Sequence, residues 1–450
     1  MACWLQIWPG ARKLTPWSVP WRKVCDVKPP SPNAPTSQIP EVLPQGVPFV
    51  EAIDYLRQKV PLPSGAWTDL WQGMHARAFV VAGANTAALV EDFHGAVQAA
   101  ISEGRSLAQF REDFDRIVAA HGWSYNGKRG WRSAVIYNTN LRMAQSAGRW
   151  GQASRVAARK RAQGETLYIR YLAVLDSRTR PAHRAWHDII LPIDHAFWET
   201  HWPPNGWNCR CTIQVLTGRQ MRRQGLEVTP EDDLPSFGDR PVRIRSADGD
   251  RMVTAPTGID AGFAYNPGVA GFGRGPDLVA MEDHGPWTAL ASPFGDRPAN
   301  PAPPDPKPTT ARLGDRAEDE EGLRQALRAG IGGDEVVLVD PLGARTRIGQ
   351  AIVDHILQDP DRRGGREPFF PLIPDLIQDP SEIWIGWAQN RVSGRVALRR
   401  RYYRAFEFGS SRAFSLVADQ DGGTWSGFTV IPGTARRLQS VRSGLRIFAD

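Results

Sequence analysis

Cysteine is scarce in this chain, with four residues in 450. So few cysteines do not form the disulfide framework of a small secreted protein, and a reducing compartment fits best. Long apolar runs are also missing, since no stretch approaches the roughly 18 apolar residues that favour a membrane-spanning helix. The N-terminus, MACWLQIWPGARKLTPW, lacks the basic start and unbroken apolar stretch of a signal peptide. We therefore expect neither export nor a membrane partner.

A strong excess of one charge is absent as well. The net charge of +7 is modest for 450 residues and does not by itself indicate a nucleic-acid partner, so the distribution of charge matters more. Hydrophobic residues make up 41% of the chain, which is enough for sizeable cores. The length accommodates about two to four domains of ordinary size.

The sequence divides into five segments, which together predict a multidomain protein. Residues 1–48 are a leader rich in proline and tryptophan, and we expect them to be disordered. Residues 49–165 are a mostly α domain, and residues 166–217 are a small α+β module that ends in Cys-x-Cys. Residues 218–314 are an extended Gly/Pro-rich region and linker, and residues 315–450 are an α+β domain with an antiparallel sheet.

Helical periodicity supports the assignment of the first domain. Apolar residues recur every four positions from Leu89 to Ile101, which gives one apolar helix face. Ser106 and Gln109 fit a capping box at the start of a second helix, and Gly122 is a suitable stop. A third, longer helical pattern follows. We therefore expect a helical bundle or an array of helical hairpins.

Turn and linker signals mark the region that follows. The segments PVRIR and RMVTAP predict a β-hairpin whose turn is ADGD, and the rest of the region reads as extended. Six prolines between Pro298 and Pro308 predict a semi-rigid spacer. Because such spacers join domains that fold independently, we expect residues 315–450 to form a separate unit.

Charge is segregated within the last domain. Residues 315–382 hold 15 acidic residues and 8 arginines, whereas residues 383–450 hold 4 acidic residues and 11 arginines. The second half also carries the predicted strands SEIWIGWA, RVALRRRYYRAFEF, AFSLVADQ and TWSGFTVIP. Arginines beside tyrosines favour binding of single-stranded nucleic acid, through phosphate neutralisation and base stacking. The alternative is an edge strand whose charges prevent aggregation.

The stretch NGWNCRC raises the question of a metal site. Cys209 and Cys211 lie two residues apart, so on a strand they share a face about 6–7 Å apart, which suits a shared metal better than a disulfide. His183 and His187 lie four residues apart and share a face of a helical turn. Two histidines and two cysteines would satisfy tetrahedral zinc. A packed, hydrogen-bonded corner is the alternative, and a catalytic Cys209–His pair is a weaker one.

Several stretches of the first 275 residues resemble the phage Mu F-like minor head proteins. They are HARAFVVAG, GWRSAVIYNTNLRMAQSAGRW, DSRTRPAHRAWHD, FWETHWPPNGWNCRC and FAYNPG. The resemblance covers about residues 48–275. It implies a minor virion protein that is added with the portal during capsid assembly, and it describes the CRC segment as structural. Its expected partners are the portal and major capsid proteins.

One histidine, His355, stands out in the last domain, which has no cysteine. A lone histidine on a helix is more often a packing residue. Here, however, Arg366, the basic strand and the hydroxyl of Thr429 supply the other groups that metal-free RNA cleavage needs. In that reaction the 2′-hydroxyl of RNA attacks the adjacent phosphorus.

The same domain resembles the phage-associated Barnase–EndoU–colicin E5/D–RelE-like nucleases, on HIL, REPFFPLIPDLIQDPSEIWIGW, the arginine-rich strand and TWSGFTVIP. The resemblance covers about residues 320–450 and implies a small α+β RNase fold that needs no cofactor. It points to His355, Arg366 and Thr429 as the catalytic set. The expected nucleic-acid-binding residues are Arg399, Arg400, Arg401 and Tyr402, with Arg400 preferred because strand alternation turns it away from both neighbouring arginines.

Three functional hypotheses follow. The first is a virion protein that joins head assembly and carries a tethered RNase into the host cytoplasm, with RNA as substrate and an immunity protein as an open question. The second is a purely structural head protein whose last domain binds nucleic acid or capsid without cleavage. The third, a metal hydrolase in the middle module, lacks a carboxylate-rich ligand set. A structural zinc ion in that module stays open.

Overall fold

The computed structural model describes residues 49–235, 238–246, 249–279, 287–291, 302–357, 365–407, 412–421, 424–434 and 436–450. The disorder expected for residues 1–48 therefore lies outside the described residues. Within the described part, no helix combines the length and the apolar character needed to cross a membrane.

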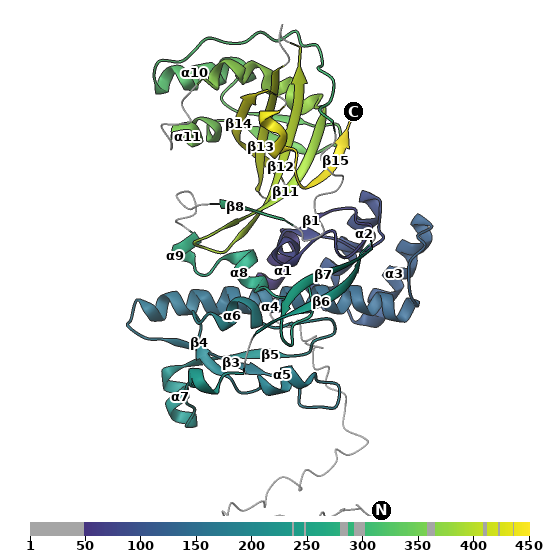
Figure 1. Ribbon diagram of the computed structural model, residues 1–450, viewed down its shortest axis with the longest axis vertical. Coiled ribbons are helices and arrows are strands. Elements are labelled where there is room, and N and C mark those ends of the chain that lie inside the picture. The colour runs from purple at the N-terminus through teal and green to yellow at the C-terminus, as the bar shows by residue number, and fades with distance from the viewer. Residues whose placement is uncertain are drawn as a thin grey trace, which may run out of the picture. The chain divides into compact units, whose positions relative to one another are not determined.

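The first part of the chain is helical, as its apolar periodicity predicts (Figure 1). Its helices are α1 (Val50–Arg57), α2 (Ala87–Ser102), α3 (Leu107–His121) and α4 (Arg129–Arg161). The capping box of α3 forms as expected, and Gly122 ends that helix in the left-handed conformation at a φ of 57°. Short elements connect α1 to α2, namely β1 (Val60–Pro61), the 3₁₀ helix η1 (Gln72–Ala76) and β2 (Ala78–Phe79).

The middle module is α+β, built on an antiparallel sheet in the order β4-β3-β5. Its strands are β3 (Leu167–Leu172), β4 (Ile190–Pro192) and β5 (Thr212–Thr217). Short helices α5 (Pro181–Ala185) and α6 (Phe197–His201) lie between the strands, and α7 (Gly218–Gln224) follows them. Three fully buried indoles, Trp186, Trp198 and Trp202, form much of its core, so this small unit is densely packed.

The region after α7 holds the predicted hairpin and also a buried helix. Strands β6 (Asp239–Ser246) and β7 (Gly249–Pro256) pair in antiparallel fashion. The stretch expected to be extended contains α8 (Pro267–Phe272), which Asn266 caps by accepting from two backbone N–H groups. Gly268 of α8 lies so close to α4 that an added Cβ would fall 2.1 Å from the Cβ of Trp150. Then follow α9 (Pro276–Val279) and β8 (Trp287–Leu290).

The last domain is an α+β unit with a mostly antiparallel sheet in the order β15-β11-β12-β13-β14-β10-β9. Among the paired strands that the structure describes in this sheet, β10 and β14 run parallel, and β8 extends the sheet by pairing with β11. The strands are β9 (Val336–Val339), β10 (Arg345–Ile348), β11 (Glu382–Asn390), β12 (Val396–Phe406), β13 (Arg412–Asp421), β14 (Thr424–Gly433) and β15 (Leu445–Ala449). The helices are α10 (Glu320–Ile331), α11 (Ala351–Leu357), η5 (Glu367–Leu372), α12 (Ile373–Gln378) and η6 (Arg437–Val441).

The helix that carries His355 is shorter than the sequence pattern indicates. Periodicity alone predicts a helix from about residue 347, with Ile348 on its apolar face. In the structure Ile348 is instead the last residue of β10, paired with Val336 of β9, and α11 begins at Ala351. Ile348 is buried in the structure, and it would also be buried on the apolar face of a helix. Its apolar character therefore could not distinguish the strand from the helix.

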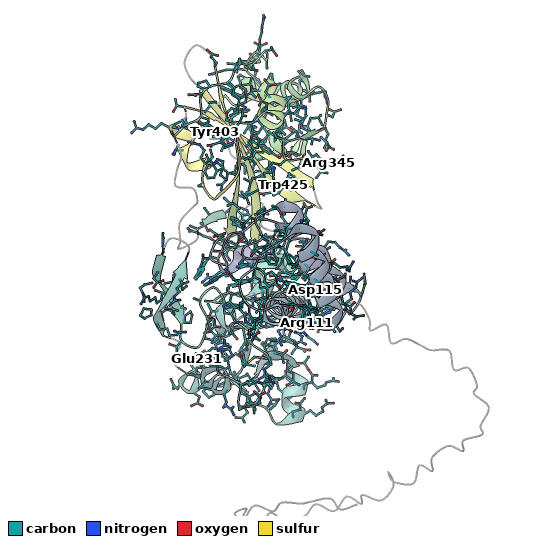
Figure 2. The ribbon with its side chains drawn as sticks, turned by 90° about the vertical axis from the view of Figure 1, so that its right-hand side faces the viewer. Arg111, Asp115, Glu231, Arg345, Tyr403 and Trp425 are labelled. Carbon is teal, nitrogen blue, oxygen red and sulfur yellow. The ribbon has the colours of Figure 1, made fainter. Side chains whose placement is uncertain are left out.

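The sheet of the last domain has two different faces. Along β12, burial alternates: Arg400 is buried and Arg399 and Arg401 are half-buried. We call the face of Arg400 the core face and the face of Arg399 and Arg401 the outer face. Trp425, labelled in Figure 2, packs against Arg400 on the core face, with 5.6 Å from the guanidinium carbon to the ring centroid. Tyr403, also labelled there, belongs to a separate apolar cluster with Leu438.

Candidate functional site

A β-bulge in β14 shapes the outer face. Val417 of β13 pairs with Thr429 and its neighbour Ala418 pairs with Gly427, so Phe428 is an extra residue in β14. In a regular strand Phe428 and Thr429 would point to opposite faces, and a bulge breaks this alternation. Bulges are frequent beside active sites because they redirect side chains in this way.

Phe428 brings the predicted histidine next to the basic strand. The His355 ring meets the Phe428 ring edge-on, with centroids 5.1 Å apart and an interplanar angle of 89°. The Arg399 guanidinium lies over the same Phe428 ring, 5.2 Å from its centroid, and over Trp287 of β8 at the same distance. Arg399 also pairs with Asp419 across the strands at 3.1 Å. The imidazole and the guanidinium are therefore held by one aromatic ring.

The other two predicted catalytic residues contact each other directly. Arg366 lies just before η5, and its Nη1 donates a hydrogen bond of 3.0 Å to Oγ1 of Thr429. Thr429 is 8% exposed, so this hydroxyl is held in place. A hydroxyl that accepts from a guanidinium keeps its own hydrogen for donation to another group. The structure thus brings His355, Arg366 and Thr429 to one stretch of β14.

Arg400 lies on the other face, in a buried polar cluster. Its guanidinium forms an ion pair with Asp340, and the side chains of the two residues are 6% and 0% exposed. Its Nε also donates to the hydroxyl of Tyr402 at 3.0 Å, and that hydroxyl donates to Asp340 and contacts Thr346 at 2.6 Å. Burial raises the pKa of Tyr402. Alternation thus separates Arg400 from its neighbours as expected, but it turns Arg400 and Tyr402 inward.

Arg401 remains on the outer face with a structural partner of its own. Its Nη1 donates to the carbonyl and to the hydroxyl of Ser443, at 3.2 and 2.9 Å. Sequence reasoning missed two contributors to this face, Phe428 and Trp287. Phe428 stood in the quoted motif TWSGFTVIP but carried no chemistry of its own, and Trp287 lies outside the segment assigned to this domain.

A second cluster forms at the Cys-x-Cys motif. His183, Cys209 and Cys211 converge so that their ligand atoms all lie within 4.8 Å of one another. His187 does not join them, because its Nδ1 accepts a hydrogen bond from the backbone N–H of Ala173 at 3.1 Å. A hydrogen bond from Cys211, together with the neighbouring His183, lowers the pKa of the Cys209 thiol. The described part of the chain adds no carboxylate to this cluster.

Comparison with protein families now bears on both clusters. Residues 91–214 match the family described as Phage Mu protein F like protein. Residues 323–449 match the family described as phage-Barnase-EndoU-ColicinE5/D-RelE like nuclease2. The chain carries a Mu F-like domain and a nuclease-like domain. Both resemblances drawn from the sequence motifs are thereby confirmed.

Two curated phage proteins are also similar to this chain. Protein F of Escherichia phage Mu, whose name assigns it to capsid assembly, is 33% identical over 260 residues, which is 52% of this chain and 57% of that protein. The Mu-like prophage FluMu F protein of Haemophilus influenzae is 30% identical over 226 residues, 46% of this chain and 53% of that protein. The chain thus spans a little over half the length of these relatives. No solved structure matches it.

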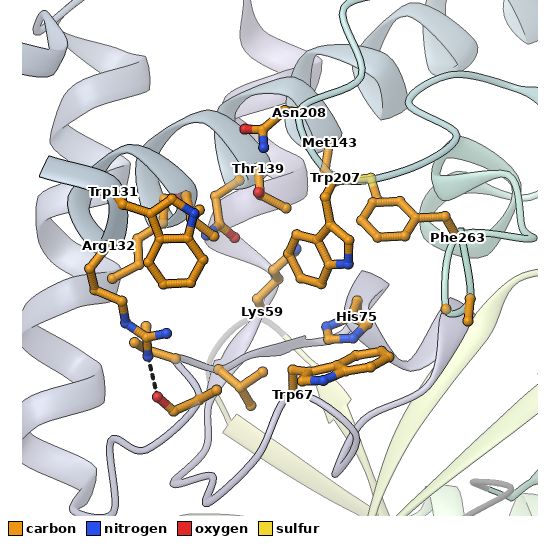
Figure 3. Close-up of a pocket in the computed structure, with 18 of the residues that line it drawn as sticks. Lys59, Trp67, His75, Trp131, Arg132, Thr139, Met143, Trp207, Asn208 and Phe263 are labelled. Atoms are coloured by element: carbon orange, nitrogen blue, oxygen red, sulfur yellow. Dashed lines mark hydrogen bonds between the residues drawn. The ribbon is translucent and has the colours of Figure 1, made fainter. Parts of the chain in front are cut away.

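Helix α4 of the Mu F-like domain lines an apolar pocket of about 470 Å³ (Figure 3). Trp67, Trp131, Trp207 and Phe263 surround it, and Lys59 reaches it from below α4. Lys59 is 5% exposed and its Nζ lies 4.6 Å from the Tyr55 ring centroid.

Electrostatics distinguish this pocket from an ordinary apolar cavity. Burial lowers the pKa of Lys59 to about 7. Burial, with the charge of Lys59 beside it, also lowers the pKa of His75 to about 4. Arg132, on the pocket wall, donates to the carbonyl of Ala82 (dashed line in Figure 3). Aromatic walls with a few polar groups are typical of a pocket that accepts an apolar group.

Proposed function

We propose that this chain is a phage or prophage minor head protein that acts in capsid assembly near the portal and carries a metal-independent RNase as its last domain. Similarity to a phage Mu protein named for capsid assembly supports the first half of the proposal. The nuclease-like family match supports the second half. The virion, and the host cytoplasm after delivery, are the locations that follow from it.

One observation carries the RNase proposal: the bulge in β14 gathers groups suited to phosphoryl transfer. Phe428 contacts both His355 and Arg399, and the next residue, Thr429, accepts from Arg366. A proton acceptor, two cations and a hydroxyl therefore border the same short segment. Metal-free cleavage of RNA needs these groups.

The proposed reaction uses the RNA 2′-hydroxyl as its nucleophile. His355 accepts the proton of this hydroxyl while O2′ forms a bond to the adjacent phosphorus. The bond between phosphorus and O5′ breaks, and the leaving O5′ takes a proton back from the imidazolium. The products are a 2′,3′-cyclic phosphate and a 5′-hydroxyl, so atoms and charge balance without a cofactor.

The cations and the hydroxyl stabilise the transition state in this scheme. Negative charge develops on the non-bridging phosphate oxygens as O2′ attacks, and preorganised donors lower its energy. Arg366 and Arg399 supply guanidinium donors, and Thr429 supplies its remaining O–H. Trp287 lies beside Arg399, so a base of the RNA can stack there.

The test uses the full-length chain, because β8 and the contacts of Arg274 with Val392 join the last domain to preceding segments. Wild type and His355→Ala are incubated with tRNA and total RNA in excess EDTA. The variant should cleave about 10²–10⁴-fold more slowly. His121→Ala is the matched control, since His121 lies in α3 and pairs with Asp92.

Two further measurements, of the ends of the RNA products and of the folding of the variant, make the outcome decisive. Cleaved RNA should carry 2′,3′-cyclic phosphate, and circular dichroism should show that His355→Ala is folded. RNA left intact by the wild type, or cleaved equally by His355→Ala, would overturn the RNase proposal.

A purely structural head protein is the second candidate, and the outer face gives it a specific basis. Arg399 between two aromatic rings suits binding of single-stranded nucleic acid without chemistry. RNA that binds and stays intact in the same experiment would favour this function. If cleavage is found, an immunity protein that covers the outer face becomes a partner to seek.

A further inference from the structure

We infer that His183, Cys209 and Cys211 bind one zinc ion at the Cys-x-Cys corner. The three residues come from two separate segments, His183 from α5 and the cysteines from the loop that leads into β5. His183 and Cys209 are 2% and 3% exposed, and Cys211 is half-buried. One imidazole and two thiolates are ligands that zinc commonly takes in proteins.

The distances fit a shared metal ion. Nδ1 of His183 lies 3.6 Å from Sγ of Cys209 and 3.6 Å from Sγ of Cys211. With Zn–S about 2.3 Å and Zn–N about 2.0–2.1 Å at a tetrahedral angle, sulfur and nitrogen should lie about 3.6 Å apart. Both nitrogen–sulfur distances therefore match those of a tetrahedral site.

Hydrogen bonds from both thiols to His183 do not explain the two equal distances. A neutral imidazole has one unprotonated nitrogen with one lone pair, so two thiols cannot both donate to it. A single cation placed between them satisfies both sulfurs and the nitrogen. Both cysteines are free of disulfides.

The remaining nitrogen of His183 is held as a metal-bound histidine requires. Nε2 lies 3.0 Å from the carbonyl oxygen of Gly258 and so carries the proton, which leaves the Nδ1 lone pair directed at the sulfurs. Gly258 has a φ of +87°, and an added Cβ would lie 2.6–2.8 Å from Ala182 and Trp186. The turn after β7 can approach His183 this closely only with glycine at this position.

The pocket beside the two cysteines is where a fourth ligand would enter. Cys209 and Cys211 line a pocket of about 380 Å³ whose wall includes Arg142, Arg149 and Arg210. A water molecule or a small anion from this pocket completes the coordination. Two thiolates would balance the charge of Zn²⁺.

Zinc content of the full-length protein tests the inference. Protein expressed in zinc-supplemented medium and washed free of loose metal should hold about one zinc per chain by mass spectrometry, as one four-coordinate site requires. His183→Ala and Cys211→Ser should each lose it. His187→Ala is the matched control and should keep it, because His187 lies four residues away with a backbone partner of its own.

Cobalt supplies a second readout that does not depend on folding of the variants. Co²⁺ added to metal-free wild type should give thiolate-to-cobalt absorption and the strong visible bands of a tetrahedral site. Folded wild type without zinc and without these bands would overturn the inference. So would equal loss of metal in His187→Ala and His183→Ala, or a Cys209–Cys211 disulfide in protein purified under reducing conditions.

Discussion

In the nuclease-like domain Arg399 lies over the rings of Trp287 and Phe428, and beside α4 Lys59 lies over the ring of Tyr55. The Arg399 side chain is 18% exposed and pairs with Asp419, whereas Lys59 is 5% exposed and burial lowers its pKa to about 7. Contact with an aromatic ring is common to both cations. The proposed contact of Arg399 with RNA depends on its access to solvent.

Arg400 extends the comparison to a third environment. It is buried like Lys59, but Asp340 neutralises it. The ion pair links β12 to the residue that follows β9, and the buried guanidinium is not available to a ligand. Neighbouring, chemically identical side chains on one strand thus have different surroundings because they face different sides of the sheet.

The largest expected effect is a loss of stability. It should distinguish a residue of the core face from the residues of the outer face. Arg400→Ala leaves Asp340 buried without its partner, which should cost about 3–5 kcal/mol in the free energy of unfolding. Denaturant titration followed by tryptophan fluorescence measures it. The double variant Arg400→Met/Asp340→Leu should recover most of the loss. If the single variant loses less than about 1 kcal/mol, Arg400 is not a structural ion pair.

The next effect is on cleavage rather than stability. Arg366→Ala removes the donor to Thr429 and a cation from the proposed site, so RNA cleavage should fall about 10²–10³-fold. Arg366→Lys should recover only part of the rate, because an ammonium group lacks the planar array of donors. Single-turnover cleavage assays with saturating protein give the rates. A normal rate in Arg366→Ala would remove this residue from the proposed catalytic set.

A smaller effect should appear in RNA binding. Arg399→Gln removes one phosphate contact, so the slope of log affinity against log salt should fall by about 0.7 for single-stranded RNA. Filter binding in the His355→Ala background avoids cleavage. Arg345, labelled in Figure 2, is an exposed arginine on β10 and provides the control Arg345→Gln. Equal slopes for both variants would contradict a specific role of Arg399.

The last effect concerns the buried lysine and depends on pH. Since the pKa of Lys59 is lowered from 10.5 to about 7, the unfolded chain binds more protons between these values. The buried lysine therefore lowers the free energy of unfolding most at low pH, and this loss diminishes as pH rises from about 7 to 10.5. One pKa unit corresponds to about 1.4 kcal/mol, so Lys59→Met should stabilise the protein at pH 7 by about 2–4 kcal/mol, with loss of the cation–π contact offsetting part of the gain.

The difference between the two proteins should shrink as pH approaches 10, and thermal unfolding across pH measures it. Lys160→Met is the control, because Lys160 is a surface residue in an ion pair with Glu165. A pH-independent difference for Lys59→Met would show that the lysine is not held in the folded protein as its burial indicates.

Local patterns in the sequence were sufficient for most elements of the fold. The capping box at Ser106, the hairpin of β6 and β7, and the strands β11 to β14 follow from periodicity and turn residues, which act over a few neighbours. β15 was missed, because a short edge strand has few residues in which alternation can show. The start of α11 was placed too early for the related reason that Ile348 is buried in either conformation.

The candidate sites depended more on tertiary structure. The sequence by itself determined which candidate functional residues the chain carries. They are His355, Arg366 and Thr429 in one domain, and a histidine pair with Cys-x-Cys in another. Only the fold decided which members meet. One extra residue in β14 brings Phe428 beside His355 and Arg399, and a backbone hydrogen bond keeps His187 away from the cysteines. Alternation showed that Arg400 and Arg399 face opposite ways, but packing over the whole sheet decided which face is buried.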